Sequence, residues 1–233
     1  MDFMPVSDLT NSAQDYLKVI WGVAEWSTAP ITVTLLAERM GVRPSSVSEA
    51  IRKLTEQGLL SHAPYRSIEL TDEGRAHAVD MVRRHRLIET FLVQTLGYGW
   101  DEVHDEAEIL EHAVSDTMVA RIDERLGHPT RDPHGDPIPS ADGRPHRPDA
   151  IRLTEAPPNR EYEITRISDD DPAMLRYFAD IGLILDARLT VQQRHPYSDV
   201  TTVHLAGQAI DINLGSGASG AIWVSSPQRA CVL

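Results

Sequence analysis

Cysteine is almost absent from this chain, and long apolar runs are missing altogether. The single cysteine among 233 residues, Cys231, excludes an internal disulfide framework and a thiolate-rich metal cage. No apolar run approaches the roughly 18 residues that a membrane-spanning helix needs. The N-terminal Met-Asp-Phe-Met-Pro also lacks the basic start and apolar stretch of a signal peptide. We therefore expect a cytoplasmic protein that does not associate with a membrane.

Positive charge is also scarce, since 22 Lys and Arg against 35 Asp and Glu give a formal net charge of −13. That balance disfavours nucleic acid as a partner, because phosphate binding needs cationic patches. The distribution of charge matters more than its sum, however. Residues 39–66 carry five cations and two acids, whereas acidic residues gather at 101–124 and 161–171. These acidic regions would repel DNA unless they held a cation.

Residues 1–75 have the pattern of a winged helix-turn-helix DNA-binding domain. Helices are expected at 12–26, after Thr34 as far as Gly41, and from the turn at 42–45 to Gly58. Two short β-prone pieces, at 59–61 and 67–70, flank a proline-containing turn and would form the wing.

The third helix of this domain is the expected reading helix. In a helix-turn-helix the second helix of the motif enters the major groove of double-stranded DNA. Hydroxyl and charged side chains of this helix and of the wing are the predicted DNA contacts: Arg43, Ser45, Ser46, Ser48, Glu49, Arg52, Lys53 and Arg66. The alternative is that Ser45 only caps the helix while Arg52 and Lys53 are solvated.

The rest of the chain divides into a helical part and a β-rich part. Residues 76–140 are expected to form a helical domain, with one helix reaching Gly97 and a second from Trp100 to Gly127. Prolines and few core residues predict a linker at 141–160. In 161–233 a period-two alternation predicts five short strands of a small barrel and a helix at 172–181. The predicted fold class is mainly α with β.

Carboxylate and imidazole side chains gather on the helical part. Glu108, Glu111 and His112 stand at i, i+3 and i+4, so they share one helical face. Further donors stand nearby: His104 one turn before Glu108, His85 and Glu89 at i, i+4 on the preceding helix, and Asp15 on the first helix. Such groups repel one another unless a cation lies among them. Oxygen and imidazole donors without sulfur favour manganese or ferrous iron, while ligand type alone leaves zinc open.

Several stretches resemble the diphtheria toxin repressor family. They are Asp15-Tyr16-Leu17, Thr71-Asp72-Glu73-Gly74, and the residues at 83–89, 103–108 and 110–116. The resemblance covers nearly the whole chain. It implies an N-terminal winged helix, a helical domain that forms a homodimer through residues 79–126, and a C-terminal SH3-like domain. It also implies a transcriptional regulator and not an enzyme.

The resemblance also implies a primary metal site made of Asp15, Glu108, Glu111 and His112, with His85 close by as a further ligand. Iron-responsive members carry methionine and cysteine where this chain has Asp15 and Glu108, so the chain resembles the manganese-responsive branch. Two carboxylates in place of two sulfur ligands suit Mn²⁺, although Fe²⁺ stays possible. Because Lys18 stands where smaller manganese regulators carry a glutamate, a two-ion cluster is not expected.

A second metal site is implied at Glu89, Asp132, His134 and Asp171. The segment Asp132-Pro133-His134-Gly135 is similar to a Cys-Pro-His-Gly segment of some three-domain manganese regulators. His104 matches an ancillary ligand of the iron-type members. The alternative for Asp171 is that residues 169–171 cap the helix expected near Pro172.

The implied function is a manganese-dependent repressor of metal-uptake genes, in which metal promotes binding of the homodimer to operator DNA. One alternative is an iron-dependent repressor of the same family. Another is a winged-helix regulator that senses a small organic ligand without metal. A metallohydrolase using Glu108, Glu111 and His112 is disfavoured, because no His-Glu-x-x-His motif is present.

Overall fold

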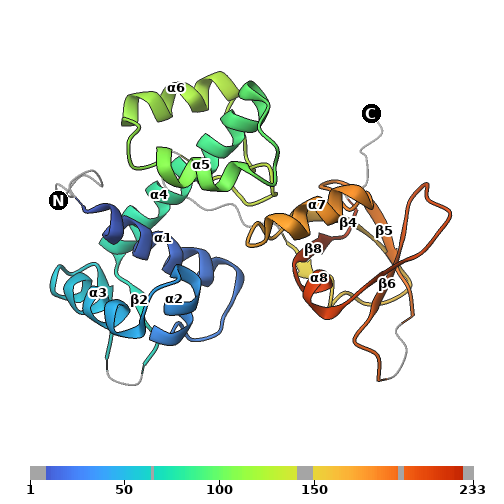
Figure 1. Ribbon diagram of the computed structural model, residues 1–233, viewed down its shortest axis with the longest axis horizontal. Helices are drawn as coiled ribbons and strands as arrows, with labels where there is room; N and C mark the ends of the chain where they lie inside the picture. Colours follow the sequence, from blue (N-terminus) through green and yellow to red (C-terminus); the bar gives the residue numbers. More distant parts are fainter. Residues whose placement is uncertain (1–8, 64–65, 141–148, 194–196, 228–233) are drawn as a thin grey trace. The chain divides into compact units, whose positions relative to one another are not determined.

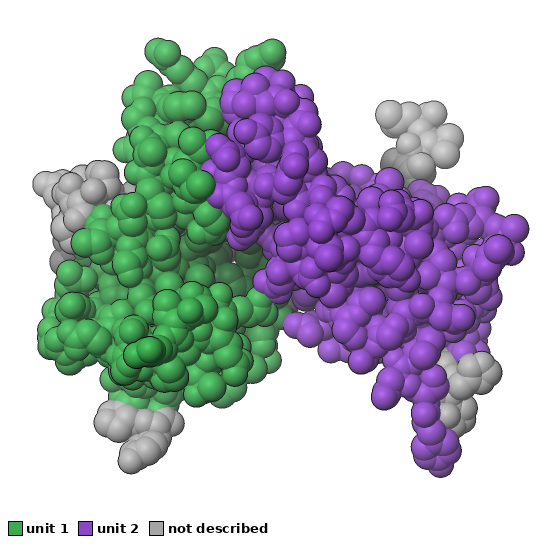
Figure 2. Space-filling view, in the orientation of Figure 1, with its two compact units in different colours: residues 1–88, 107–130, 138–146 green, residues 89–106, 131–137, 147–233 purple. Residues whose placement is uncertain are grey.

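The structure, a computed structural model, describes residues 9–63, 66–140, 149–193 and 197–227 (Figure 1). The chain divides into two units. The first unit comprises residues 1–88, 107–130 and 138–146, and the second comprises residues 89–106, 131–137 and 147–233 (Figure 2).

The N-terminal part of the first unit contains three helices and a hairpin. These are α1 (Asn11–Trp26), α2 (Val33–Met40), α3 (Pro44–Glu56), β1 (Leu60–Ser61) and β2 (Glu69–Leu70), with the two strands antiparallel. Leu17 and Ile20 of α1 share one buried core with Val47 and Ile51 of α3. The predicted helix–helix–helix–wing order is confirmed, and α3 is fixed to α1 through a common core.

The helix starts differ slightly from those predicted. Thr10 caps α1 by accepting a hydrogen bond from the backbone N–H of Ala13, and Thr32 caps α2 in the same way. Helix α3 begins at Pro44, so Ser45 lies in its first turn and does not cap it. The early start follows from proline, which is favoured at the first position of a helix.

The helical domain contains α4 (Asp72–Phe91), which runs directly into a π-helix, η2 (Leu92–Leu96). It continues with α5 (Val103–Leu110) and α6 (Asp116–Leu126). The prediction of one helix from Trp100 to Gly127 was wrong, because the chain leaves the helix after Leu110. Ser115 then starts α6 as its N-cap, with its hydroxyl accepting from the backbone N–H of Met118 at 3.2 Å.

The C-terminal part of the second unit is an antiparallel sheet in the order β3-β8-β4-β5-β6-β7. Its elements are β3 (Ile151–Arg152), β4 (Arg160–Ile167), α7 (Pro172–Asp180), β5 (Arg188–Val191), β6 (Thr201–Leu205), β7 (Ile212–Leu214), α8 (Ser216–Gly220) and β8 (Ile222–Ser225). The five predicted strands and the predicted helix are present. They enclose a core that includes Ile164, Phe178 and Val203.

The expected linker at 141–160 differs from the structure. Residues 141–148 lie outside the described residues. Beyond them, β3 pairs with β8, and Leu153 and Ala156 are fully buried in the core of the sheet domain. The prolines of this stretch predicted a linker, so the two-residue strand β3 was not expected from the sequence. Among the helices that the structure describes, none has the length and apolar character required to cross a bilayer.

Candidate metal centre and DNA-binding face

The first unit brings Asp15 of α1 against Glu111 and His112, which follow the end of α5. Asp15 Oδ1 lies 2.9 Å from His112 Nε2, and Glu111 Oε1 lies 3.7 Å from the same nitrogen. One donor atom from each of the three residues lies within 4.8 Å of the others. Residues that are 96 positions apart in the chain therefore form one cluster of metal-type donors, which we call the α1–α5 cluster.

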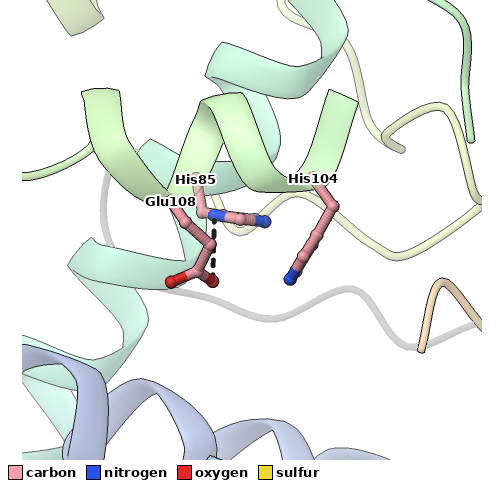
Figure 3. Close-up of side chains that lie close together, drawn as sticks. All are labelled: His85, His104 and Glu108. Atoms are coloured by element: carbon pink, nitrogen blue, oxygen red, sulfur yellow. Dashed lines mark ion pairs between the residues drawn. The ribbon is translucent and has the colours of Figure 1, made fainter. Parts of the chain in front are cut away.

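Lys18, one turn after Asp15, supplies a cation to the same cluster. Its Nζ donates to Glu108 Oε1 at 2.5 Å and to Glu111 Oε1 at 2.6 Å. Glu111 Oε2 lies 2.5 Å from Nδ1 of His85 on α4. Glu108 thus faces Lys18, and its Oε1 is 3.9 Å from His85 Nδ1 (Figure 3). Glu108 and His85 lie at the border of the three-donor group, and their role as ligands stays a prediction.

The charged groups of this cluster differ in whether their surroundings favour or disfavour the charged form. Burial would lower the pKa of Lys18, but Glu111 and Glu108 outweigh it and raise that pKa. Burial would raise the pKa of Glu111, but His85 and Lys18 lower it. For Asp15, burial raises the pKa, and the opposing charges of His112 and Lys18 do not outweigh it. Among these three groups, Asp15 is therefore the one whose pKa shift disfavours its charged form.

The donor set of the α1–α5 cluster fits a divalent cation. Asp15 Oδ1 is buried and accepts no hydrogen bond, although buried carboxylate oxygens normally have a partner. For metal bonds of about 2.1 Å, neighbouring ligands of an octahedral ion lie about 3 Å apart. The 2.9 Å between Asp15 Oδ1 and His112 Nε2 has this spacing.

A second cluster lies entirely within the second unit and combines Glu89, His104, His134 and Asp169. His104 Nδ1 lies 3.3 Å from Glu89 Oε1 and 3.1 Å from Asp169 Oδ2. His134 Nδ1 lies 3.9 Å from Glu89 Oε2, and Glu89, His134 and Asp169 each offer a donor within 4.8 Å of the others. We call this group the Glu89 cluster.

His134 presents a free nitrogen to the Glu89 cluster. Its Nε2 lies 2.6 Å from the backbone oxygen of Trp100, while its buried Nδ1 has no hydrogen-bond partner. A carbonyl oxygen can only accept, so Nε2 carries a proton, and Nδ1 has a lone pair when the ring is neutral. Burial would lower the pKa of His134, but Asp132, Glu89 and Asp169 outweigh it and raise that pKa. Metal-binding histidines commonly have their other ring N–H held in this way.

The loop that carries His134 is anchored to β4. Ile167 N–H donates to the backbone oxygen of His134 at 2.9 Å, and Arg166 Nε donates to Asp136 Oδ1 at 2.8 Å. Gly135 has φ +91°, and a Cβ there would lie 2.1 Å from the Thr165 carbonyl oxygen. Only glycine permits this close approach, which places His134 near the end of β4 and hence near Asp169.

Two residues predicted for the second site have other roles in the structure. Asp171 caps α7, because its Oδ1 accepts from the backbone N–H of Ala173 and Met174 at 2.9 and 3.2 Å. Asp132 Oδ1 accepts from the backbone N–H of His134 and Asp136, both at 2.9 Å, and so shapes its own loop. Among the described residues, the structure brings Asp169 and not Asp171 into the donor group with Glu89 and His134.

Asp169 was missed because it belongs to a run of three aspartates beside a helix start. From the sequence alone, nothing distinguishes which of these three carboxylates lies at the metal site and which caps the helix. His104, expected only as an ancillary residue, is central to the Glu89 cluster. Burial would lower the pKa of His104, but Asp169 and Glu89 outweigh it and raise that pKa to about 11. An imidazolium therefore offsets part of the negative charge of the two carboxylates, which a divalent cation would offset in full.

Most of the predicted DNA-binding side chains lie on the exposed face of α3, while Arg43 precedes the helix and Arg66 lies in the wing. Val47, Ile51 and Leu54 are buried on the opposite face. The side chains predicted to contact DNA are all exposed, including the wing residue Arg66: Arg43, Ser45, Ser46, Ser48, Glu49, Arg52, Lys53 and Arg66.

Ion pairs within α3 neutralise part of its positive charge. Arg52 pairs with Glu49 at 2.7 Å and with Glu56 at 2.5 Å, and Lys53 lies 3.4 Å from Glu49. The hydrogen bond from Arg52 lowers the pKa of Glu49. Phosphate contacts by these cations would have to compete with the two glutamates.

Three protein-family profiles match successive parts of the chain. Residues 8–68 match the iron dependent repressor N-terminal DNA binding domain. Residues 71–140 match the iron dependent repressor metal binding and dimerisation domain, and residues 151–226 match the FeoA domain.

The curated relatives and solved structures agree with these profiles. The iron-dependent repressor IdeR of Mycobacterium leprae is 34% identical over 199 residues, which cover 80% of this chain and 86% of that protein. The chain belongs to the diphtheria toxin repressor family. The diphtheria toxin repressor of Corynebacterium efficiens is 37% identical over 134 residues, 58% of each chain. A solved manganese-dependent transcriptional repressor in complex with manganese is 55% identical, with a TM-score of 0.88 over 92% of this chain and all of that one.

Membership in the diphtheria toxin repressor family establishes the general activity. Proteins of this family are DNA-binding, metal-dependent transcriptional repressors and not enzymes. This chain has the DNA-binding, dimerisation and FeoA domains in the same order. The relatives include both manganese-dependent and iron-dependent repressors, so membership alone leaves the identity of the metal open.

Proposed function

We propose that this protein is a manganese-dependent repressor of metal-uptake genes, and that the α1–α5 cluster is its regulatory metal site. The observation that carries the proposal is the buried, unpartnered Oδ1 of Asp15 beside His112 Nε2. Asp15, Glu111 and His112 would hold the ion, with Glu108 and His85 at its border. Oxygen and imidazole donors suit Mn²⁺, and a 55% identical repressor was solved with manganese.

The proposed regulation follows from where the ligands stand. Asp15 lies on α1, which shares a core with α3, whereas Glu111 and His112 follow α5 of the dimerisation domain. A bound cation would supply positive charge that ties the two domains together. In a homodimer this tie would fix the spacing of the two α3 helices on double-stranded operator DNA, where half-sites lie about 34 Å apart.

The homodimer is proposed to form through the helical domain. Ile109 on α5 and Met118 on α6 are large apolar side chains with exposed fractions of 69% and 47%. The structure describes a single chain, in which these side chains face outward. A dimer contact over α5 and α6 would remove them from water.

The Glu89 cluster is proposed as a second metal site, formed by Glu89, His134 and Asp169 with His104. Supporting this is the unpartnered Nδ1 of His134, which faces two carboxylates. Asp132 would act by shaping the loop and not as a ligand.

Operator binding as a function of metal tests the proposal. Fluorescence anisotropy on the DNA upstream of the protein's own gene would compare Mn²⁺, Fe²⁺ and Zn²⁺. We expect Mn²⁺ to tighten binding by roughly 5- to 150-fold, the range of typical allosteric coupling. Asp15→Ala should abolish this gain. Asp105→Ala, an exposed carboxylate on the same helix as Glu108, should keep it.

The outcome also separates the alternatives. Full operator binding by the metal-free protein would refute the regulatory role of the site. A larger gain with Fe²⁺ than with Mn²⁺ would favour an iron-dependent repressor, as the 34% identity to IdeR of Mycobacterium leprae also allows.

A further inference from the structure

We propose that Gln14 is a positioning residue that fixes the tautomer of His112 and so keeps His112 Nε2 open to a cation. Gln14 is 5% exposed and immediately precedes Asp15 on α1. Its Nε2 donates to the Leu9 carbonyl at 3.1 Å, and its Oε1 lies 2.7 Å from His112 Nδ1. The importance of the open nitrogen rests on the metal site proposed above.

Its contacts with Leu9 and His112 determine the direction of the Gln14 amide. The Leu9 carbonyl can only accept a hydrogen bond, so the NH₂ group of Gln14 must face it and Oε1 must face His112. Oε1 is also only an acceptor, so His112 Nδ1 must carry a proton. A neutral imidazole has one N–H, so in the neutral His112 ring Nε2 has a lone pair.

Without Gln14 the neighbouring carboxylate would favour the opposite tautomer. Asp15 Oδ1 lies 2.9 Å from His112 Nε2, and a hydrogen bond to a carboxylate is stronger than one to an amide oxygen. An N–H at Nε2 would occupy the lone pair that a metal ion needs.

The segment before α1 supports this arrangement. The Leu9 side chain is buried in the core of the DNA-binding domain, and the backbone N–H of Gln14 donates to Thr10 oxygen at 3.0 Å. The Leu9 carbonyl is therefore fixed relative to the Gln14 amide. The position of the Leu9 carbonyl therefore determines how the Gln14 amide is oriented, and the Gln14 amide determines which nitrogen of His112 carries the proton.

The tautomer can be read directly in the metal-free protein. Long-range ¹⁵N–¹H NMR at pH 8 distinguishes an Nδ1–H ring, an Nε2–H ring and an imidazolium, and His112→Gln assigns the signal. We expect Nδ1–H in the wild type and a shift to Nε2–H in Gln14→Leu. Gln14→Glu, whose carboxylate can only accept, should restore Nδ1–H. Thr10→Ala weakens the cap of the same helix and should leave the tautomer unchanged.

Manganese titration of the same variants completes the test. Loss of an outer-shell partner of a metal-binding histidine typically weakens metal binding by about 10- to 100-fold, and we expect this for Gln14→Leu but not for Gln14→Glu. Nε2–H or imidazolium in the wild type would overturn the proposal. The proposal would also be overturned if the His112 ring keeps Nδ1–H in Gln14→Leu. The same holds if the tautomer changes in that variant while manganese binding is not weakened. If the His112 tautomer depends on Gln14 as expected but the wild-type protein binds no manganese, the result would instead refute the proposed metal site.

Discussion

At the scale of single residues, Lys18 determines the charge of the α1–α5 cluster. One ammonium group donates to both Glu108 and Glu111 and is 11% exposed. The Lys18 ammonium group occupies Glu111 Oε1, the oxygen that a second cation would otherwise need. This placement supports a single ion in the cluster, which stays the prediction drawn from the family resemblance.

Removal of the Lys18 charge should destabilise the metal-free protein. Lys18→Gln leaves two carboxylates without their cation, and loss of one partner of a buried pair costs about 3–5 kcal/mol. Urea unfolding in EDTA measures this loss, and added Mn²⁺ should recover more stability than in the wild type. Lys53→Gln, which removes an exposed cation paired with Glu49 at 3.4 Å, should have little effect. Equal stabilities of the two variants would contradict the assigned role of Lys18.

Asp169 and Asp171 form a matched pair with different expected outcomes. Asp169→Asn removes a donor of the Glu89 cluster, so we expect elemental analysis to find one fewer Mn²⁺ per chain. Asp171→Asn removes the carboxylate cap of α7. Because asparagine also caps helices, Asp171→Ala is the sharper change and should cost about 1 kcal/mol without loss of metal. Loss of metal from Asp171→Ala would return Asp171 to the ligand set.

At the scale of elements, α4 and α6 are tied by a small polar network. Arg83 of α4 donates to Asp123 Oδ2 of α6 at 2.7 Å and to the Pro139 carbonyl at 2.7 Å. His128 Nδ1 lies 2.9 Å from the same oxygen of Asp123. Burial would raise the pKa of Asp123, but His128 and Arg83 outweigh it and lower that pKa below its usual 3.8.

This network predicts an acid-dependent part of the stability. Because the folded-state pKa of Asp123 is depressed, its stabilisation is present above about pH 4 and is lost as the pH falls through the folded value. Asp123→Asn should lower the free energy of unfolding by about 2 kcal/mol at pH 7. That difference should shrink toward pH 3. Urea unfolding of both proteins in EDTA at several pH values measures it, and a difference that does not change with pH would exclude the ionised carboxylate as its cause.

The break between α5 and α6 shows why element boundaries were only partly predicted. Apolar residues continue at helical spacing from Ala107 to Ile122, so periodicity alone favoured one helix. Ser115 acts as an N-cap inside that pattern. Glu111 and His112 consequently lie beyond α5, although the backbone N–H of Glu111 still donates to Ala107 oxygen at 2.9 Å.

At the scale of the whole molecule, a chain of net charge −13 must bind a polyanion. The exposed cations Arg52 and Lys53 on α3 are paired with Glu49, and Arg52 also with Glu56. Phosphate binding by cations gives a salt dependence that steepens with each additional contact.

Glu49→Gln should therefore strengthen non-specific DNA binding and steepen its salt dependence, because Arg52 and Lys53 lose a competing partner. Anisotropy titrations of Mn²⁺-loaded protein at several salt concentrations measure both effects. Glu161→Gln makes the same charge change on an exposed residue of the sheet domain and should leave the slope unchanged. Equal effects of the two variants would show that net charge matters and not the α3 ion pairs.

The sequence by itself determined the order of the domains, the winged helix, the period-two strands and the types of metal donor. These depend on local periodicity and on chemistry that side chains carry with them. Only the tertiary structure decided that Asp169 joins the Glu89 cluster, that Glu108 faces Lys18, and that Gln14 reaches His112. Those contacts join residues far apart in the chain. Where several side chains of the same type are neighbours in sequence, the position of a helix end or a loop decides which of them reaches the site, and no local pattern encodes that position.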